Sequence, residues 1–212
     1  MSEAALREAI CRTGASIFSR GLTHGATGNI SVRLDDGWLM TPTGSNLGNL
    51  DPARLSRLDA RGAHIAGDPP TKEASLHRAV YEERPQSNAV VHLHSTHSVA
   101  VSVLAGVDPA DVLPPLTAYY VMRVGTLPLV PFYRPGDPAL AAAIRDHARG
   151  HHALLLANHG PVVAGSSLSA ALDATEELEE TARLHLMLQG QSVRPLSPAQ
   201  VAEVRAAFPV KG

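Results

Sequence analysis

Hydrophobic residues recur along the chain at two spacings, one typical of helices and the other of strands. Over residues 4–20 they follow one helical face, and a glycine stands where the helix would end. Thr71 is placed to cap a helix running to about residue 83, with Lys72 and Glu73 in its first turn. Further helices are expected over residues 95–104, 138–148, from Ser167 or Ser169 to Gln189, and after Pro198.

Shorter apolar stretches predict strands. NISVRL and WLMTP alternate around Asp35-Asp36-Gly37, which favours a hairpin, and LSRLDA and AHIAG form a weaker pair around Arg61-Gly62. Residues 88–94, ALLLAN and PVVAG are buried-strand candidates. LTAYYVMRVG and LPLVPFY are also predicted as strands, restricted by nearby prolines to sheet edges or ends. Hairpins and crossovers together predict an α/β fold with a mixed sheet covered by helices, rather than an all-parallel sheet.

Length and composition bound the class of protein. The chain has 212 residues, 44% of them hydrophobic, which predicts one domain over residues 1–212. A net charge of -2 argues against nucleic acid or an anionic membrane surface as partner, so a small molecule is expected. Cys11 is the only cysteine, which suits a reducing cytoplasm. Glu3 and Arg7 interrupt the stretch that a signal peptide would need, and we expect a soluble cytoplasmic protein.

Three histidines are candidate metal ligands. His92 and His94 are two apart in a predicted strand, so both imidazoles can reach one ion, although an isolated pair of this kind is more often two half-buried polar residues. His159 ends another apolar run, before Gly160, and alone would more often be a turn residue. Three neutral imidazoles leave positions open for substrate, as in catalytic zinc sites. Manganese, iron and cobalt accept the same ligands.

Glu73 is the candidate fourth ligand or acid/base, because a carboxylate beside a metal can coordinate it or move a proton. Its spacing alone fits better with an acidic residue that stabilises a helix N-terminus. Only the family resemblance described below favours the functional interpretation.

Several segments have the composition of anion sites. Gly28-Asn29, Thr43-Gly44-Ser45 and Thr71-Lys72 can each present free backbone N–H groups, although such residues serve turns and caps more often than ligands. Arg123 and Arg134 are further candidates for a carboxylate or phosphate, with surface solvation as the alternative.

Two other groups of ionisable residues are expected to face solvent. Glu176, Glu177, Glu179 and Glu180 spread around the axis of a predicted helix, which suits a solvated face better than a paired-carboxylate site. His151 and His152 precede a predicted strand and are also expected to be exposed.

The motifs, taken together, resemble those of a known superfamily. GNIS, TPTG, an acidic residue at a helix start, HLH and the NHG of LLLANHGP occur in the order and spacing of the class II aldolase, ribulose-phosphate 4-epimerase and adducin-head superfamily, over nearly the whole chain. The resemblance implies a single-domain three-layer α/β/α fold with a central mixed, largely antiparallel sheet. It also implies a homotetramer whose site lies near a subunit boundary.

The same resemblance assigns roles to residues. It implies one zinc ion per chain on His92, His94 and His159, with Glu73 as a further ligand and in proton transfer. It implies that the substrate phosphate is bound by Gly28, Asn29, Thr43, Gly44 and Thr71.

Within the superfamily, five stretches are most similar to the 3-oxo-tetronate 4-phosphate decarboxylases: TPTGSNLGNLDPARLS, TKEASLHRAVY, VVHLHSTHS, VMRVGTLPLVPFYRPGD and EELEETA. Lys72 stands where the sugar-phosphate aldolases tend to have a small hydroxyl residue. The resemblance implies loss of carbon dioxide through a metal-stabilised enediolate to give dihydroxyacetone phosphate. Glu73 would transfer the proton, and Lys72 or Arg123 would neutralise the leaving carboxylate or the phosphate.

Alternative functions follow from the same superfamily. A fuculose-phosphate type aldolase or a ribulose-phosphate 4-epimerase would use the same enediolate, and an adducin-like binding module would keep the fold without catalysis. Aldolases of this kind resemble one another in a tyrosine supplied by a neighbouring subunit. Neither Tyr119 nor Tyr120 can be matched to it from the sequence.

Overall fold

The computed structural model describes residues 1–134 and 137–209. Pro135 and Gly136, within one of the stretches that resemble the decarboxylases, and residues 210–212 of the predicted domain lie outside it. The strands are β1 (Asn29–Leu34), β2 (Gly37–Met40), β3 (Ser56–Asp59), β4 (His64–Ala66), β5 (Ala89–His92), β6 (Leu129–Val130), β7 (Ala153–Leu156) and β8 (Gly160–Gly165).

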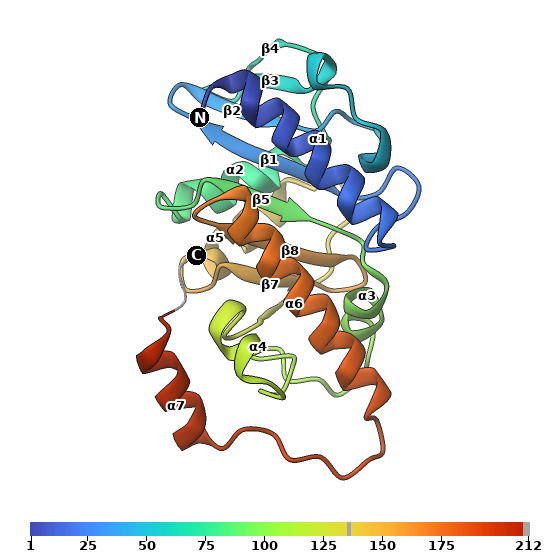
Figure 1. Ribbon diagram of the computed structural model, residues 1–212, viewed down its shortest axis with the longest axis vertical. Helices are drawn as coiled ribbons and strands as arrows, with labels where there is room; N and C mark the ends of the chain where they lie inside the picture. Colours follow the sequence, from blue (N-terminus) through green and yellow to red (C-terminus); the bar gives the residue numbers. More distant parts are fainter. Residues whose placement is uncertain (135–136, 210–212) are drawn as a thin grey trace.

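These strands form one sheet in the order β4-β3-β2-β1-β5-β8-β7-β6 (Figure 1). Neighbours run antiparallel except β6 and β7, which are parallel. The prediction of a mixed, largely antiparallel sheet is therefore confirmed. Both predicted hairpins are present, β1 with β2 and β3 with β4.

Helices cover both faces of the sheet, except the last one, α7, which packs against α4. They are α1 (Glu3–Ser19), α2 (Ala74–Glu83), α3 (Thr96–Ser102), α4 (Ala118–Arg123), α5 (Pro138–Ala148), α6 (Leu168–Met187) and α7 (Pro198–Ala207), with short 3-10 turns η1 (Leu47–Asn49) and η2 (Pro52–Arg54). None of those that the structure describes combines the length and the apolar character needed to cross a bilayer.

Side-chain alternation along the strands divides the core residues between the two faces of the sheet. Val90 and Val162 point toward α2 and α5, whereas Val91 and Val163 point to the opposite face, where α1, α3, α4 and α6 pack. In Figure 1, α1 and α6 cross the near face of the sheet and α2 and α5 lie behind it. This arrangement confirms the expected three layers.

One element was predicted with the wrong type. LTAYYVMRVG is not a strand, because its central part forms helix α4. The Thr117 hydroxyl accepts a hydrogen bond from the N–H of Tyr120 at 3.0 Å, and Tyr120, Val121 and Val124 bury one face at helical spacing. LPLVPFY contributes only the two-residue strand β6, which lies at the sheet edge.

Candidate metal and active site

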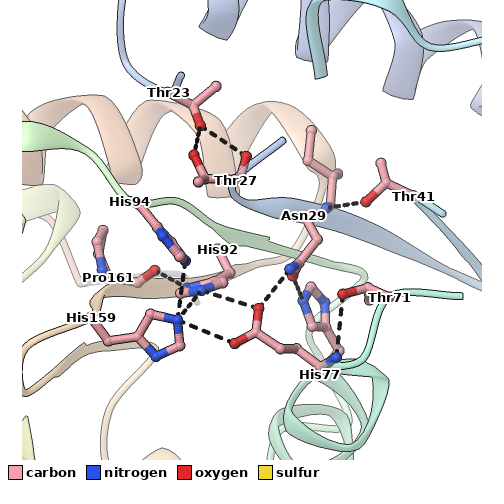
Figure 2. A network of polar contacts seen from close by, with 12 residues as sticks. Thr23, Thr27, Asn29, Thr41, Thr71, His77, His92, His94, His159 and Pro161 are labelled. Atoms are coloured by element: carbon pink, nitrogen blue, oxygen red, sulfur yellow. Dashed lines mark hydrogen bonds and ion pairs between the residues drawn. The ribbon is translucent and has the colours of Figure 1, made fainter. Parts of the chain in front are cut away.

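Three histidines, labelled in Figure 2, converge with one glutamate where strand β5 ends and the chain turns from β7 to β8. One ligand atom from each of His92, His94, His159 and Glu73 lies within 4.8 Å of all the others. The Nε2 atom of His159 is 3.3 Å from that of His92 and 3.0 Å from that of His94. The two carboxylate oxygens of Glu73 each lie 3.3 Å from an imidazole, one from His92 and the other from His159. The structure therefore brings together all four predicted ligands.

The first two histidines come from the end of strand β5. His92 is its last residue, paired with Asn29 on one side and Val162 on the other. His94 lies beyond the strand, which differs from the prediction that both residues belong to it. The chain turns toward α3 after His92, and His94 still reaches the cluster because the N–H of Leu93 bonds to the Pro161 carbonyl at 3.3 Å.

The third histidine lies in the tight turn between β7 and β8. Asn158 has a left-handed φ of 57°, which asparagine tolerates better than most residues, and Gly160 has a φ of 152°. A Cβ on Gly160 would lie 2.2 Å from the Leu93 carbonyl oxygen. Glycine at this position thus lets the start of β8 approach β5 closely enough for His159 to meet His92.

Hydrogen bonding and burial set the orientation and charge of the imidazoles. His92 donates its Nδ1–H to the Pro161 carbonyl at 2.8 Å, which fixes the ring with Nε2 facing the cluster. Burial, and then the neighbouring His92, lower the pKa of both His94 and His159 to about 4, so both are neutral at pH 7. The Oε1 atom of Glu73 is buried without a hydrogen bond among the described residues. This donor set fits a divalent ion such as zinc.

The Glu73 side chain faces the histidine cluster and does not cap its own helix. It is the N-cap of α2 but makes no side-chain cap bond, and α2 begins at Ala74, so the prediction that Lys72 and Glu73 lie in the first turn is wrong. The reason is local: the Thr71 hydroxyl accepts from the N–H of Glu73 at 3.2 Å, which turns the chain before the helix.

Glu73 is a carboxylate at neutral pH. Burial opposes its ionisation, but the neighbouring His92 and a 2.7 Å hydrogen bond from the Nδ2 of Asn29 outweigh burial, and its pKa lies below the ordinary value. A base or an anionic ligand is therefore available beside the three imidazoles.

Backbone bonds connect the segments expected to hold phosphate. The N–H of Thr43 donates to the Pro69 carbonyl at 2.9 Å, and the N–H of Thr71 donates to that of Thr41 at 3.3 Å. The Thr41 hydroxyl in turn accepts from the N–H of Ile30 at 3.1 Å, directly after Gly28-Asn29. Thr43 and Gly44 also line a cavity of about 270 Å³.

The three cationic side chains predicted to bind an anion, Lys72, Arg123 and Arg134, lie in different surroundings. Lys72 is exposed and forms no ion pair with another described residue. Arg123 pairs with Asp173 at 2.8 Å and lines a separate cavity of about 650 Å³ rich in α6 glutamates. Arg134 pairs with Asp137 at 3.7 Å. The structure therefore does not bring Arg123 or Arg134 to the histidines.

A cavity of about 480 Å³ opens in front of the histidines. Its lining residues are His24, His94, Thr96, Val99, Phe132, Tyr133, Asn158 and His159. Sequence reasoning missed His24, Phe132 and Tyr133, because nothing in their spacing relates them to the histidine motifs. A volume of this size suits a small metabolite.

Sequence reasoning also missed a buried polar chain beneath the site. His77 donates to the Oδ1 atom of Asn29, and behind it lie Ser31 and Tyr81. The spacing of these residues in the sequence could have indicated the buried polar chain. His77 stands one helical turn after Glu73, and Ser31 alternates with apolar Ile30 and Val32 on the facing strand.

Two residues expected to face solvent are buried. Glu179 accepts hydrogen bonds from the backbone N–H groups of His97 and Ser98, each at 2.9 Å, and so holds the start of α3 just after His94. The Nε2–H of His152 donates to the Arg123 carbonyl at 2.8 Å, and burial lowers the His152 pKa to about 4. Both expectations fail because the partners lie far away in sequence.

Known proteins resemble the chain over nearly its whole length. The sequence model described as Class II Aldolase and Adducin N-terminal domain matches residues 8–186. A 3-oxo-tetronate 4-phosphate decarboxylase of Cupriavidus necator is 51% identical over 212 residues, covering 98% of this chain and 97% of that protein. An L-fuculose phosphate aldolase of Haemophilus influenzae is 34% identical, covering 100% of this chain and 97% of that protein. The crystal structure of YgbL from Escherichia coli has a TM-score of 0.94 and 49% identity, covering 96% of this chain and 99% of that one.

Proposed function

The chain belongs to the family of class II aldolases and adducin N-terminal domains, and from that premise we propose that it decarboxylates 3-oxo-tetronate 4-phosphate. The observation that carries the proposal is the convergence of Glu73 with three imidazoles beside the Gly28–Asn29 segment. The name of the 51% identical relative selects the substrate among those of the family. Residues 1–212 are proposed to form one domain that performs this reaction.

The reaction breaks one bond and forms one. The bond between carbons 1 and 2 of the substrate breaks, carbon dioxide leaves, and the electron pair passes through carbon 2 into the 3-oxo group. A divalent ion held by His92, His94 and His159 would act as a Lewis acid toward the negative charge that develops on the substrate oxygens. One proton from solvent then adds to carbon 2, which gives dihydroxyacetone phosphate.

Glu73 is the residue proposed to deliver that proton. Its half-buried carboxylate adjoins both His92 and His159, so it lies within reach of a substrate bound at the cluster. In the resting site it is ionised, and it would take a proton from solvent and pass it to carbon 2. The same carboxylate can serve as a metal ligand before substrate arrives.

Gly28, Asn29, Thr43, Gly44 and Thr71 are proposed to hold the phosphate. Their support is the backbone linkage that ties these segments to one another and to β1. Lys72, which is exposed beside Thr71, is proposed to neutralise the phosphate or the leaving carboxylate. Arg123 could do so only after leaving Asp173, which makes Lys72 the better supported of the two.

Zinc is the proposed metal, one ion per chain, because three nitrogen ligands and a carboxylate suit it. Elemental analysis of protein purified without a histidine tag should give about one metal per chain, as expected for a three-histidine site. His92→Ala should lose most of it. His64→Ala, which removes an exposed histidine, should keep it. A His92→Ala protein with its full metal content would reject the ligand assignment.

The substrate assay is decisive for the reaction. Metal-loaded protein supplied with 3-oxo-tetronate 4-phosphate should release carbon dioxide and dihydroxyacetone phosphate in equal amounts. Fuculose- and ribulose-type phosphates supplied in parallel test the aldolase and epimerase alternatives, of which the 34% identical relative supports the aldolase. Silence with the acid substrate alone would reject the decarboxylase proposal, and silence with every substrate would favour an adducin-like binding module.

A cytoplasmic homotetramer with its site near a subunit boundary completes the proposal. Tyr119, 58% exposed on α4, is the one of the two adjacent tyrosines that can reach a neighbouring subunit, because Tyr120 is fully buried. Mass measurement in solution tests the tetramer. Tyr119→Phe should lower turnover without changing the mass, whereas unchanged turnover would remove Tyr119 from the site.

A further inference from the structure

A chain of hydrogen bonds leads from Glu73 into the interior between β1 and α2, and Figure 2 shows its link between Asn29 and His77. The Nδ2 atom of Asn29 donates to the Oε2 of Glu73 at 2.7 Å, and its Oδ1 accepts from the Nε2 of His77. Beyond His77, the Ser31 hydroxyl lies 2.6 Å from Nδ1 of that ring and 2.9 Å from the Tyr81 hydroxyl. His77 and Ser31 are both 0% exposed. The link between them is therefore shielded from competing water.

The direction of every hydrogen bond in this chain is fixed. A carboxylate only accepts, so the amide nitrogen of Asn29 must face Glu73 and its oxygen must face His77. Burial lowers the pKa of His77 to about 3, so its ring is neutral with a single N–H. That hydrogen must be on Nε2, and Nδ1 then accepts from Ser31. Reversing the Asn29 amide would set oxygen against carboxylate and N–H against N–H.

Packing fixes the end of the hydrogen-bond chain that is farthest from Glu73. Tyr81 stacks on Trp38 with ring centroids 6.1 Å apart, and the Arg33 guanidinium lies 4.6 Å from the Tyr81 centroid. Ser31 is fixed by its strand register opposite Val90. Because both anchors belong to regular elements, the His77 ring is held in place, and its tautomer is then set by Glu73 acting through the Asn29 amide.

We infer that His77 is a positioning residue whose Nε2–H orients the Asn29 amide, so that Asn29 offers N–H donors, and no acceptor, to Glu73 and to a bound phosphate. Nδ2 carries two hydrogens, of which Glu73 takes one. The second hydrogen is a donor that Asn29 still has available for a ligand. The identity of that ligand as a phosphate rests on the proposed function, whereas the orientation of the amide does not.

Binding of inorganic phosphate to the metal-loaded protein, followed by calorimetry, tests the inference without turnover. His77→Leu should weaken phosphate binding about tenfold, because it leaves the Asn29 oxygen unpaired and the amide free to reverse. His77→Gln, whose amide can still donate to Asn29, should restore much of the loss. Thr175→Val removes another buried hydroxyl, which donates to the Ala171 carbonyl within α6, and should leave phosphate binding unchanged.

A double-variant cycle separates positioning from general support. Asn29→Ala should weaken phosphate binding by itself, and adding His77→Leu should weaken it no further, because His77 acts through Asn29. Fully additive losses would overturn the inference, as would a folded His77→Leu protein that binds phosphate like the wild type. Should His77→Leu not fold, Ser31→Ala replaces it in the cycle, with a smaller loss expected.

NMR of the His77 ring nitrogens shows which of them carries the hydrogen, and so tests the orientation of the Asn29 amide. We expect a protonated Nε2 and an unprotonated Nδ1, and the opposite tautomer would overturn the inference. If the wild-type protein binds no phosphate, the phosphate site of the proposed function fails and with it the second half of the inference. The tautomer still decides whether His77 orients Asn29, so the two failures remain distinct.

Discussion

Asn29 and His92 are direct partners across the antiparallel strands β1 and β5. This pairing sets Gly28 against the backbone of the ligand strand: a Cβ there would lie 2.9 Å from the His92 carbonyl oxygen. A candidate phosphate segment and a candidate metal ligand therefore share one rigid register. Moving either one displaces the other.

Gly28→Ala should lower both stability and metal affinity. Gly28 has a left-handed φ of 79°, and strain at such positions costs on the order of 1–3 kcal/mol of unfolding free energy. Gly106→Ala is a matched control, because its φ is 82° and no atom lies within 4 Å of the added carbon. Urea unfolding and metal titration should show a stability loss in both variants but weaker metal binding only in Gly28→Ala. Equal metal affinities would mean that the close contact with His92 has no influence on the site.

Glu179→Ala should destabilise the protein by about 2 kcal/mol or more, because the backbone N–H groups of His97 and Ser98 lose a charged acceptor. Since α3 begins just after His94, metal affinity should fall as well. Glu180→Ala is the control: Glu180 is exposed and its nearest cation, Arg183, is 3.4 Å away. Denaturant unfolding of the two variants compares them, and similar midpoints would contradict the buried role of Glu179.

Glu73→Gln should retain substrate binding and lower turnover by about 100-fold or more, the usual range for loss of a general acid or base. The amide keeps the shape of the carboxylate but cannot carry the proton between solvent and substrate. Steady-state kinetics of the metal-loaded variant separate kcat from KM. Turnover equal to that of the wild type would remove Glu73 from proton transfer.

His152 should make stability depend on pH. Its pKa is about 4 in the folded protein, where burial lowers it from 6.5, so the unfolded chain takes up a proton first as pH falls. The free energy of unfolding should therefore decrease from about pH 6.5 to about pH 4, by up to about 1.4 kcal/mol per pH unit from this residue. Urea unfolding of metal-free protein should show a shallower slope for His152→Gln than for the exposed-site control His64→Gln. Equal slopes would contradict a neutral, buried His152.

Most of the sheet could be predicted from the sequence, because hairpins and buried strands have local signals. The alternation around the turn at residues 35–37 is one such signal, and it identifies β1 and β2. Helix α4 could not be predicted from the sequence. Valine and tyrosine favour strands, whereas the helix depends on the Thr117 cap and on packing against α6.

The site could be predicted in part for the same reason. His92 and His159 stand beside apolar runs, so their positions at strand ends follow from spacing. Glu179 could not be recognised, because its partners His97 and Ser98 lie about eighty residues away. The orientation of Asn29 likewise depends on His77, which spacing alone leaves as one histidine among many.

The pairing of β5 with β8 has a consequence for the order of folding. His92 and His159 are 67 residues apart in sequence, so their ligand atoms meet only after a long loop has closed. Local helices and the β1–β2 hairpin can form before this step, but a three-histidine site cannot. Metal uptake during refolding should therefore follow the late, non-local stage and not nucleate the fold.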